Sequence, residues 1–176
     1  MSYTPYDQCA RSVYRALEIL GGLRRRERVA ADKPGDIHRR RRTADIALQA
    51  TFDDLRRAFL TPIDREDVLY LRQVCERVAT TAEDVVLALY QAGEHVLCAD
   101  DTALLSAVTA ECEALHEALI ALPAYPRNDG ILRHLTAAER RHGAVAELGG
   151  RRTLLRVSRA CRDATEALRR ILLSIT

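Results

Sequence analysis

Aromatic residues are scarce in this chain of 176 residues, which has no Trp, two Phe and an aromatic content of 5%. Its hydrophobic content of 48% therefore depends mainly on aliphatic side chains. Residues such as Ala and Leu favour seams between helices, whereas sheets are usually rich in aromatic and β-branched residues. The composition favours an all-α fold, and the length favours one domain, residues 1–176, with a single core.

Long apolar runs and signal sequences are also missing. No stretch approaches the ~18 unbroken apolar residues that a membrane-spanning helix needs. The segment from Met1 to Gln8 lacks the basic and apolar regions of a signal peptide. The five cysteines, an odd number without C-x-x-C spacing, argue against a disulfide framework and a zinc knuckle. We therefore expect a cytoplasmic protein that does not span a membrane and whose thiols are reduced.

The chain has no strong charge of either sign and no familiar catalytic motif. Its formal net charge is +2, which does not favour nucleic acid as a partner of the whole molecule. Lys33 is the only lysine, so arginine supplies nearly all of the positive charge. There is no Gly-rich phosphate loop, no G-x-S-x-G and no H-E-x-x-H motif. We expect a protein that is not an enzyme.

Turn and helix-end signals divide the chain into six helical segments. The signals are Lys33-Pro34-Gly35, Thr61-Pro62, Ala99-Asp100-Asp101, the stretch from Pro123 to Gly130, and Gly149-Gly150. The short connections between these segments predict an antiparallel, up-and-down six-helix bundle.

Apolar residues recur at spacings of three and four in each segment, which places them on one face of a helix. The stripe of the third segment comprises Val68, Leu71, Cys75, Val78, Ala82, Val85 and Leu89. The fourth has Leu105, Val108, Cys112, Leu115, Leu119 and Leu122, and the sixth has Leu154, Val157, Cys161, Ala164, Leu168, Ile171 and Ile175. Shorter stripes are Cys9, Val13, Leu20 and Leu23; Leu48, Phe52, Leu55 and Phe59; and Ile131, Leu135, Ala138 and Val145.

Cysteine and histidine also fall on these stripes. Cys9, Cys75, Cys112 and Cys161 occupy stripe positions, and we interpret them as small buried hydrophobes rather than metal ligands. His142 falls on the stripe of the fifth segment, where we predict a histidine satisfied by a hydrogen bond.

Three arginines of the last segment, Arg152, Arg156 and Arg159, are spaced by four and three residues. This spacing predicts a basic strip on one helix face. Two interpretations stay open. The strip is either a solvated face paired with nearby carboxylates or a site for an anion or nucleic acid.

The turn between the second and third segments carries the most specific motif of the chain. It reads Thr61, Pro62, Ile63, Asp64, Arg65, Glu66 and Asp67. Pro62 should stop the second helix, and Asp64 should cap the third by accepting the N–H of Asp67. With its flanking residues, the segment 59–68 resembles the corresponding turn of the PhoU-like family, in the branch of accessory proteins to Pit phosphate transporters.

The resemblance implies a PhoU-like fold of two loosely repeated three-helix halves. It also implies a role in regulating phosphate transport through contact with a transporter or signalling protein. Members of the family bind metal ions through helix-borne carboxylates one turn apart. The positions that match these carboxylates are Asp45, Glu76, Glu83, Glu139 and Asp163.

This chain departs from the family pattern at many metal positions. The departures are Arg41, Gln49, Thr80, Gly143, Arg156 and Arg159. Lone carboxylates hold hard cations poorly. We therefore expect a degenerate site with no cofactor in preference to a bound divalent or iron ion.

Our leading hypothesis is a non-catalytic accessory protein of inorganic phosphate or related anion transport, which acts through protein contacts. The first alternative is a metal-storing or metal-sensing helical bundle. The second is a binder of anions or nucleic acid that uses the arginine strip. A further expectation is a homo-oligomer, because every helix carries a continuous apolar stripe and part of one stripe is then exposed to contact a second copy of the chain.

Overall fold

The computed structural model of the chain describes residues 5–26, 33–57, 64–125 and 129–175. Across these ranges it contains six α-helices and two short 3₁₀ helices, with no strand. The helices are α1 (Pro5–Arg24), α2 (Lys33–Arg57), α3 (Arg65–Gln91), η1 (Ala99–Asp101), α4 (Thr102–Ala121), η2 (Leu122–Ala124), α5 (Gly130–Leu148) and α6 (Arg152–Ile175). The predicted all-α fold is confirmed.

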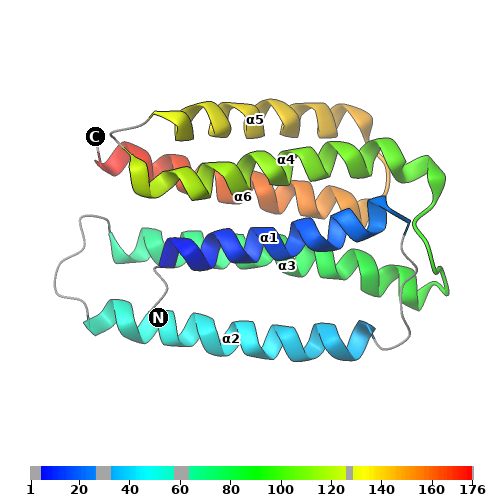
Figure 1. The fold of residues 1–176 in the computed structure, drawn as a ribbon, viewed down its shortest axis with the longest axis horizontal. Helices are drawn as coiled ribbons and strands as arrows, with labels where there is room; N and C mark the ends of the chain where they lie inside the picture. Colours follow the sequence, from blue (N-terminus) through cyan, green and yellow to red (C-terminus); the bar gives the residue numbers. More distant parts are fainter. Residues whose placement is uncertain (1–4, 27–32, 58–63, 126–128, 176) are drawn as a thin grey trace.

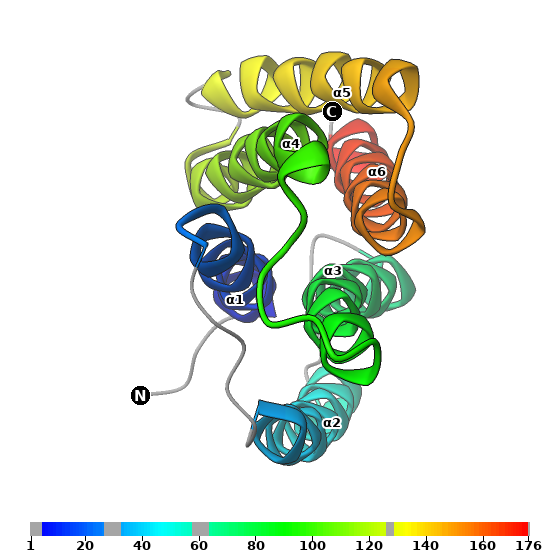
Figure 2. The same ribbon diagram turned by 90° about the vertical axis from the view of Figure 1, so that its right-hand side faces the viewer.

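Each α-helix runs antiparallel to the one before it, as the up-and-down prediction requires (Figure 1). The bundle has a centre of four helices, in which α1 packs against α3 and α4, and α3 and α4 pack against α6. Helices α2 and α5 lie outermost, α2 against α3 at one end and α5 against α4 and α6 at the other (Figure 2). The chain therefore forms one bundle in which a four-helix centre is flanked by these two outer helices.

The hydrophobic core follows the predicted stripes in five of the six helices. Every predicted stripe residue of α1, α3, α4 and α5 is buried, with Leu122 lying in η2 directly after α4. In α6 the stripe is buried as far as Ile171, while Ile175 near the end of the helix is partly exposed. Aliphatic periodicity was sufficient to predict these buried faces because each of the five helices packs against at least two others.

Helix α2 differs from the prediction. Leu48 is partly exposed, and the buried positions among the described side chains of α2 are Ile37, Ala44 and Thr51, one every seven residues. The side chains of Phe52, Leu55 and Phe59, which completed the predicted stripe, lie outside the described part of the chain. The described face of α2 is thus narrow and partly polar, so polar contacts contribute to its attachment.

Two predicted breaks have clear structural roles. Lys33-Pro34-Gly35 forms the first turn of α2, where a proline removes no helical hydrogen bond. Gly149 and Gly150 connect α5 to α6 with φ angles of 63° and 119°, which side chains rarely adopt. A Cβ atom on Gly150 would lie 3.0 Å from Leu104 Cδ2. The second glycine is therefore required for both its backbone conformation and its close approach to α4.

The capping prediction is partly wrong in detail. Asp64 is the N-cap of α3, but its carboxylate accepts the N–H of Glu66 at 3.0 Å instead of that of Asp67. Arg65, Glu66 and Asp67 form the first turn of α3. Thr61, Pro62 and Ile63 lie outside the described residues. Among the described helices, none has an apolar stretch long enough to cross a membrane.

Candidate functional site

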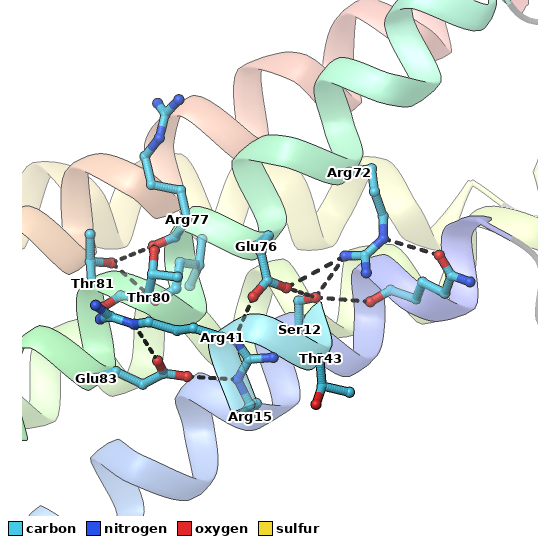
Figure 3. Close-up of polar contacts among 12 residues, drawn as sticks. Ser12, Arg15, Arg41, Thr43, Arg72, Glu76, Arg77, Thr80, Thr81 and Glu83 are labelled. Carbon is cyan, nitrogen blue, oxygen red and sulfur yellow. Dashed lines mark hydrogen bonds and ion pairs between the residues drawn. The ribbon is translucent and has the colours of Figure 1, made fainter. Parts of the chain in front are cut away.

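Two buried carboxylates on α3 form the centre of a polar cluster between α1, α2 and α3 (Figure 3). Glu76 and Glu83 are seven residues apart, about two helical turns, so both point from the same face of α3. Glu83 is fully buried and Glu76 is nearly so. Buried carboxylates require hydrogen-bonded countercharges, because the protein interior solvates a lone charge poorly.

The countercharge to both carboxylates comes from Arg15 of α1. Its Nε donates to Glu83 Oε1 at 2.9 Å, and its Nη2 donates to Glu76 Oε1. Arg41 of α2 donates from Nε to the other oxygen of Glu83, Oε2, at 2.8 Å. The two oxygens of the buried Glu83 are thus satisfied by arginines from two different helices. The planar guanidinium group suits such oriented contacts with carboxylates.

Ser12 and Arg72 complete the buried end of the cluster. Ser12 Oγ lies 2.8 Å from Glu76 Oε2, and Arg72 donates from Nη1 to Ser12 Oγ at 2.8 Å. Arg72 also donates from Nε to Gln8 Oε1 at 3.1 Å, while its Nη1 lies 3.7 Å from Glu76 Oε2. The side chain of Arg72 is almost entirely buried. Helices α1 and α3 are therefore joined by a continuous chain of polar contacts.

Polar contacts also attach the outlying helix α2. Arg41 Nη2 donates to the backbone oxygen of Thr80 at 2.9 Å and to Asp84 Oδ1 at 2.7 Å. Burial by itself would lower the pKa of Arg41, but hydrogen bonds and the charges of Asp84 and Glu83 raise it above its ordinary value. At the other end of α2, Thr51 donates to Gln8 Oε1 at 2.6 Å.

An open cleft of about 530 Å³ lies beside this cluster, with walls from α1, α2 and α3. It is lined by Gln8, Arg11, Ser12, Arg15, Arg39, Arg40, Thr43, Ala44, Ala47, Arg72 and Glu76. Among the described residues, the lining contains five arginines and a single carboxylate, that of Glu76. Outside the lining, Asp36 Oδ1 accepts from Arg39 at 2.7 Å. The cleft has the size of a small-molecule site and the charge of an anion site.

The structure does not gather the five carboxylates implied by the family resemblance. Glu76 and Glu83 share Arg15, whereas Asp45 is exposed on α2. Glu139 Oε1 accepts from Arg169 Nε at 2.8 Å, and Asp163 Oδ2 lies 3.6 Å from Arg77 Nη1. Among the described residues, no group of three His, Cys, Asp or Glu side chains is placed to hold a metal ion. Arginine therefore provides the positive charge beside four of these five carboxylates.

A second buried polar cluster lies between α4, α5 and α6. Ser158 Oγ donates to Glu111 Oε2 at 2.5 Å, and His142 Nδ1 lies 3.0 Å from Glu111 Oε1 and 2.9 Å from Ser158 Oγ. The hydrogen-bonded histidine predicted at this position is confirmed. Both partners meet the same ring nitrogen of His142, so the group lacks the relay geometry of a Ser-His-acid triad, in which the two ring nitrogens have different partners.

Burial raises the pKa of Glu111 to about 8, although the hydrogen bond from Ser158 and the charge of Arg162 oppose the shift. The pKa of His142 is lowered, first by burial and then by Arg162. At neutral pH, therefore, Glu111 is mostly protonated and His142 is mostly neutral. The two clusters differ in kind, since the first is ionic and the second is a neutral hydrogen-bonded group.

The predicted arginine strip lies on one face of α6. Arg152, Arg156 and Arg159 line a smaller pocket of about 340 Å³ together with Leu155. Arg156 Nη2 lies 3.6 Å from Asp84 Oδ2 on α3, so part of the strip is paired with a carboxylate. The predicted adjacency of the three arginines is present in the structure.

The cysteines behave as predicted from their stripe positions. Cys9, Cys75, Cys112 and Cys161 are fully buried, and Cys98 is exposed. The sulfur atoms of Cys112 and Cys161 lie 3.0 Å apart. The pKa of the Cys161 thiol is raised by its hydrogen bond with Cys112 and by burial, so this thiol is a poor nucleophile.

The chain matches no protein-family model and no curated protein. The residues that sequence reasoning missed are Ser12, Arg15 and Arg72, which bring the α3 carboxylates into the cluster. A weak signal was present for one of them, because Arg72 and Glu76 are four residues apart and directly follow the stripe residues Leu71 and Cys75. Arg15 has no such signal, since its partners lie more than 60 residues away in sequence.

Proposed function

We propose that the protein is a non-catalytic accessory or regulatory protein of inorganic phosphate or related anion transport, acting through protein contacts. The observation that carries the proposal is the arginine-lined cleft between α1, α2 and α3. A cleft whose described lining has five arginines and one carboxylate suits an anion, because guanidinium groups form charge-assisted hydrogen bonds with anionic oxygens. The turn that includes Asp64, Arg65, Glu66 and Asp67 supplies the resemblance to phosphate-transport accessory proteins.

The described side chains favour binding over catalysis. Four of the five thiols are buried. The Ser158 hydroxyl donates to Glu111, and His142 meets both groups through a single ring nitrogen, which is not the arrangement that activates a nucleophilic serine. Exposed apolar side chains such as Ile46, Ile120 and Leu148 provide contact points for a partner protein. These features fit a protein that senses an anion and presents its helix faces to a partner.

A gene deletion in the host tests the proposal directly. We expect the deletion to change the initial rate of radiolabelled phosphate uptake and the onset of the phosphate-starvation response, and we expect the wild-type gene to restore both. Sulfate uptake measured in the same cells is the control for a general effect on transport or growth. Unchanged phosphate uptake together with an unchanged starvation response would refute the proposed function.

A further inference from the structure

We infer that the arginine-lined cleft binds condensed inorganic phosphate, such as pyrophosphate or tripolyphosphate. The inference deepens the proposed function, on which it rests, by naming the anion that the cleft recognises. Its support comes from the charge, the size and the chemical character of the residues that line the cleft.

The charge of the lining suits a ligand with several negative charges. Arg11 and Arg15 come from α1, Arg39 and Arg40 from α2, and Arg72 from α3. The Glu76 carboxylate, the one acidic group among the described lining residues, already accepts from Arg15 and Ser12. Glu83 and Asp36, which lie outside the lining, also pair with Arg15 and Arg39. The ion pairs described above thus set three carboxylates against five arginines, and a polyanion between the walls would add negative charge to this arginine-rich space.

The size of the cleft favours a chain of phosphoryl groups over a single one. At about 530 Å³ it lies within the range of ~300–1,000 Å³ typical of sites for small organic molecules, far more than one phosphate ion needs. A chain of phosphoryl groups can contact arginines on both walls at once. Orthophosphate can reach fewer of them, so we expect it to bind more weakly.

The lack of aromatic side chains among the described lining residues favours inorganic polyphosphate over nucleotides as the ligand. None of the described lining residues is Phe, Tyr or Trp, so the cleft offers no ring on which a nucleobase could stack. Stacking on aromatic or arginine planes is a usual contribution to base binding. Here the arginines would have to contact both phosphates and base, and we expect a nucleoside triphosphate to gain nothing over tripolyphosphate.

The ligand would also link α2 to the rest of the bundle. Helix α2 packs chiefly on α3, and its described buried face is narrow. A polyanion held by arginines of α1 and α2 would add contacts across a boundary where the helices themselves make few. Binding should therefore slow amide hydrogen exchange within residues 33–57.

Calorimetric titration of the full chain with sodium tripolyphosphate tests the inference. The cleft variant is R11Q/R40Q, and the matched control is R152Q/R159Q in the α6 pocket. All four arginines are exposed, and both variants lose two positive charges. Thermal unfolding establishes that both variants remain folded. A parallel hydrogen-exchange measurement on wild-type protein locates the response along the chain.

We expect the cleft variant to weaken tripolyphosphate binding about tenfold or more, because charge-assisted hydrogen bonds are strong, and the control to weaken it less than about threefold. Orthophosphate should bind more weakly than tripolyphosphate, and ATP should bind no more tightly. Equal losses in the two variants would indicate diffuse charge attraction, and a larger loss in the control would move the site to α6. Either of these two results would overturn the inference. So would tighter binding of ATP than of tripolyphosphate, or no binding of tripolyphosphate at low salt.

The outcome is separable from that of the gene deletion. Binding by the purified protein together with unchanged phosphate uptake would preserve the cleft assignment and refute the transport role. Altered uptake without tripolyphosphate binding would preserve the transport role and refute the ligand.

Discussion

Replacing Glu111 by Gln should remove a large pH dependence from the stability of this protein. Burial raises the pKa of this carboxyl from 4.5 to about 8 in the folded chain. Between these two values the folded state holds a proton that the unfolded state releases, so the free energy of unfolding falls as pH rises. At about 1.4 kcal/mol per pH unit, the full contribution is up to about 5 kcal/mol. The loss is complete above about pH 8.

The Glu111→Gln variant keeps the shape and the hydrogen-bonding capacity of a protonated carboxyl. Its amide oxygen can accept from Ser158, and its amide N–H can donate to His142 Nδ1. Wild type and variant should therefore have similar stability near pH 5. Near pH 9 the variant should be more stable by several kcal/mol.

Urea denaturation of both proteins at intervals from pH 5 to pH 9 measures this difference. His142 and His116, whose pKa values burial lowers, also contribute to the pH dependence of wild type. Their contribution has the opposite sign, because stability rises with pH as the unfolded histidines lose their protons. Both proteins contain these histidines, so most of the histidine contribution cancels when the free energy of unfolding of the variant is compared with that of wild type. Parallel stability profiles for the two proteins would refute a protonated Glu111 in the folded state.

Three further substitutions, with Gly143→Ala as a control, test the cluster, the cap and the connection between α5 and α6 by urea denaturation at neutral pH. Glu83→Ala should lower the free energy of unfolding by about 3 kcal/mol, because Arg15 and Arg41 lose a buried partner. A loss below about 1 kcal/mol would mean that water replaces the Glu83 carboxylate as their partner. Asp64→Ala should cost about 1 kcal/mol through the lost cap, and no effect would contradict the capping role. Gly150→Ala should cost about 2 kcal/mol, because residue 150 has a positive φ and its Cβ would lie close to Leu104. Gly143→Ala should stabilise the protein slightly, because Gly143 lies within α5 and a Cβ there meets only open space.

The helices of this protein could be predicted because their signals are local. Stripe residues such as Val78 and Leu115 recur at helical spacing, and their burial follows from the periodicity alone. The exception is instructive. Helix α2 has few neighbours, so Leu48 on its predicted stripe remains partly exposed, while Ala44 and Thr51 face the bundle. A stripe predicts a buried face reliably only where enough of the bundle lies against it.

The candidate site was predictable in part. The family resemblance singled out Glu76 and Glu83 as important carboxylates, and the structure places both in the buried cluster. It did not predict that Arg15 would contact both, because a pattern matched to metal ligands contains no information about competing cations. The strip of Arg152, Arg156 and Arg159 was predictable, since one helix places all three on the same face.

By itself, the sequence determined the all-α class, the approximate limits of the helices and the buried face of most of them. Each of these depends on residues three or four positions apart, whose relation is set by helix geometry. Only the tertiary structure decided which charges meet. Arg15 and Glu83 are 68 residues apart, and Arg41 and Glu83 are 42 apart, so packing of the helices alone brings them within hydrogen-bond distance. The arginine-lined cleft results from the same packing, because its walls belong to three helices, and only α2 shows a run of arginines, at 39–42, while α1 and α3 contribute single ones.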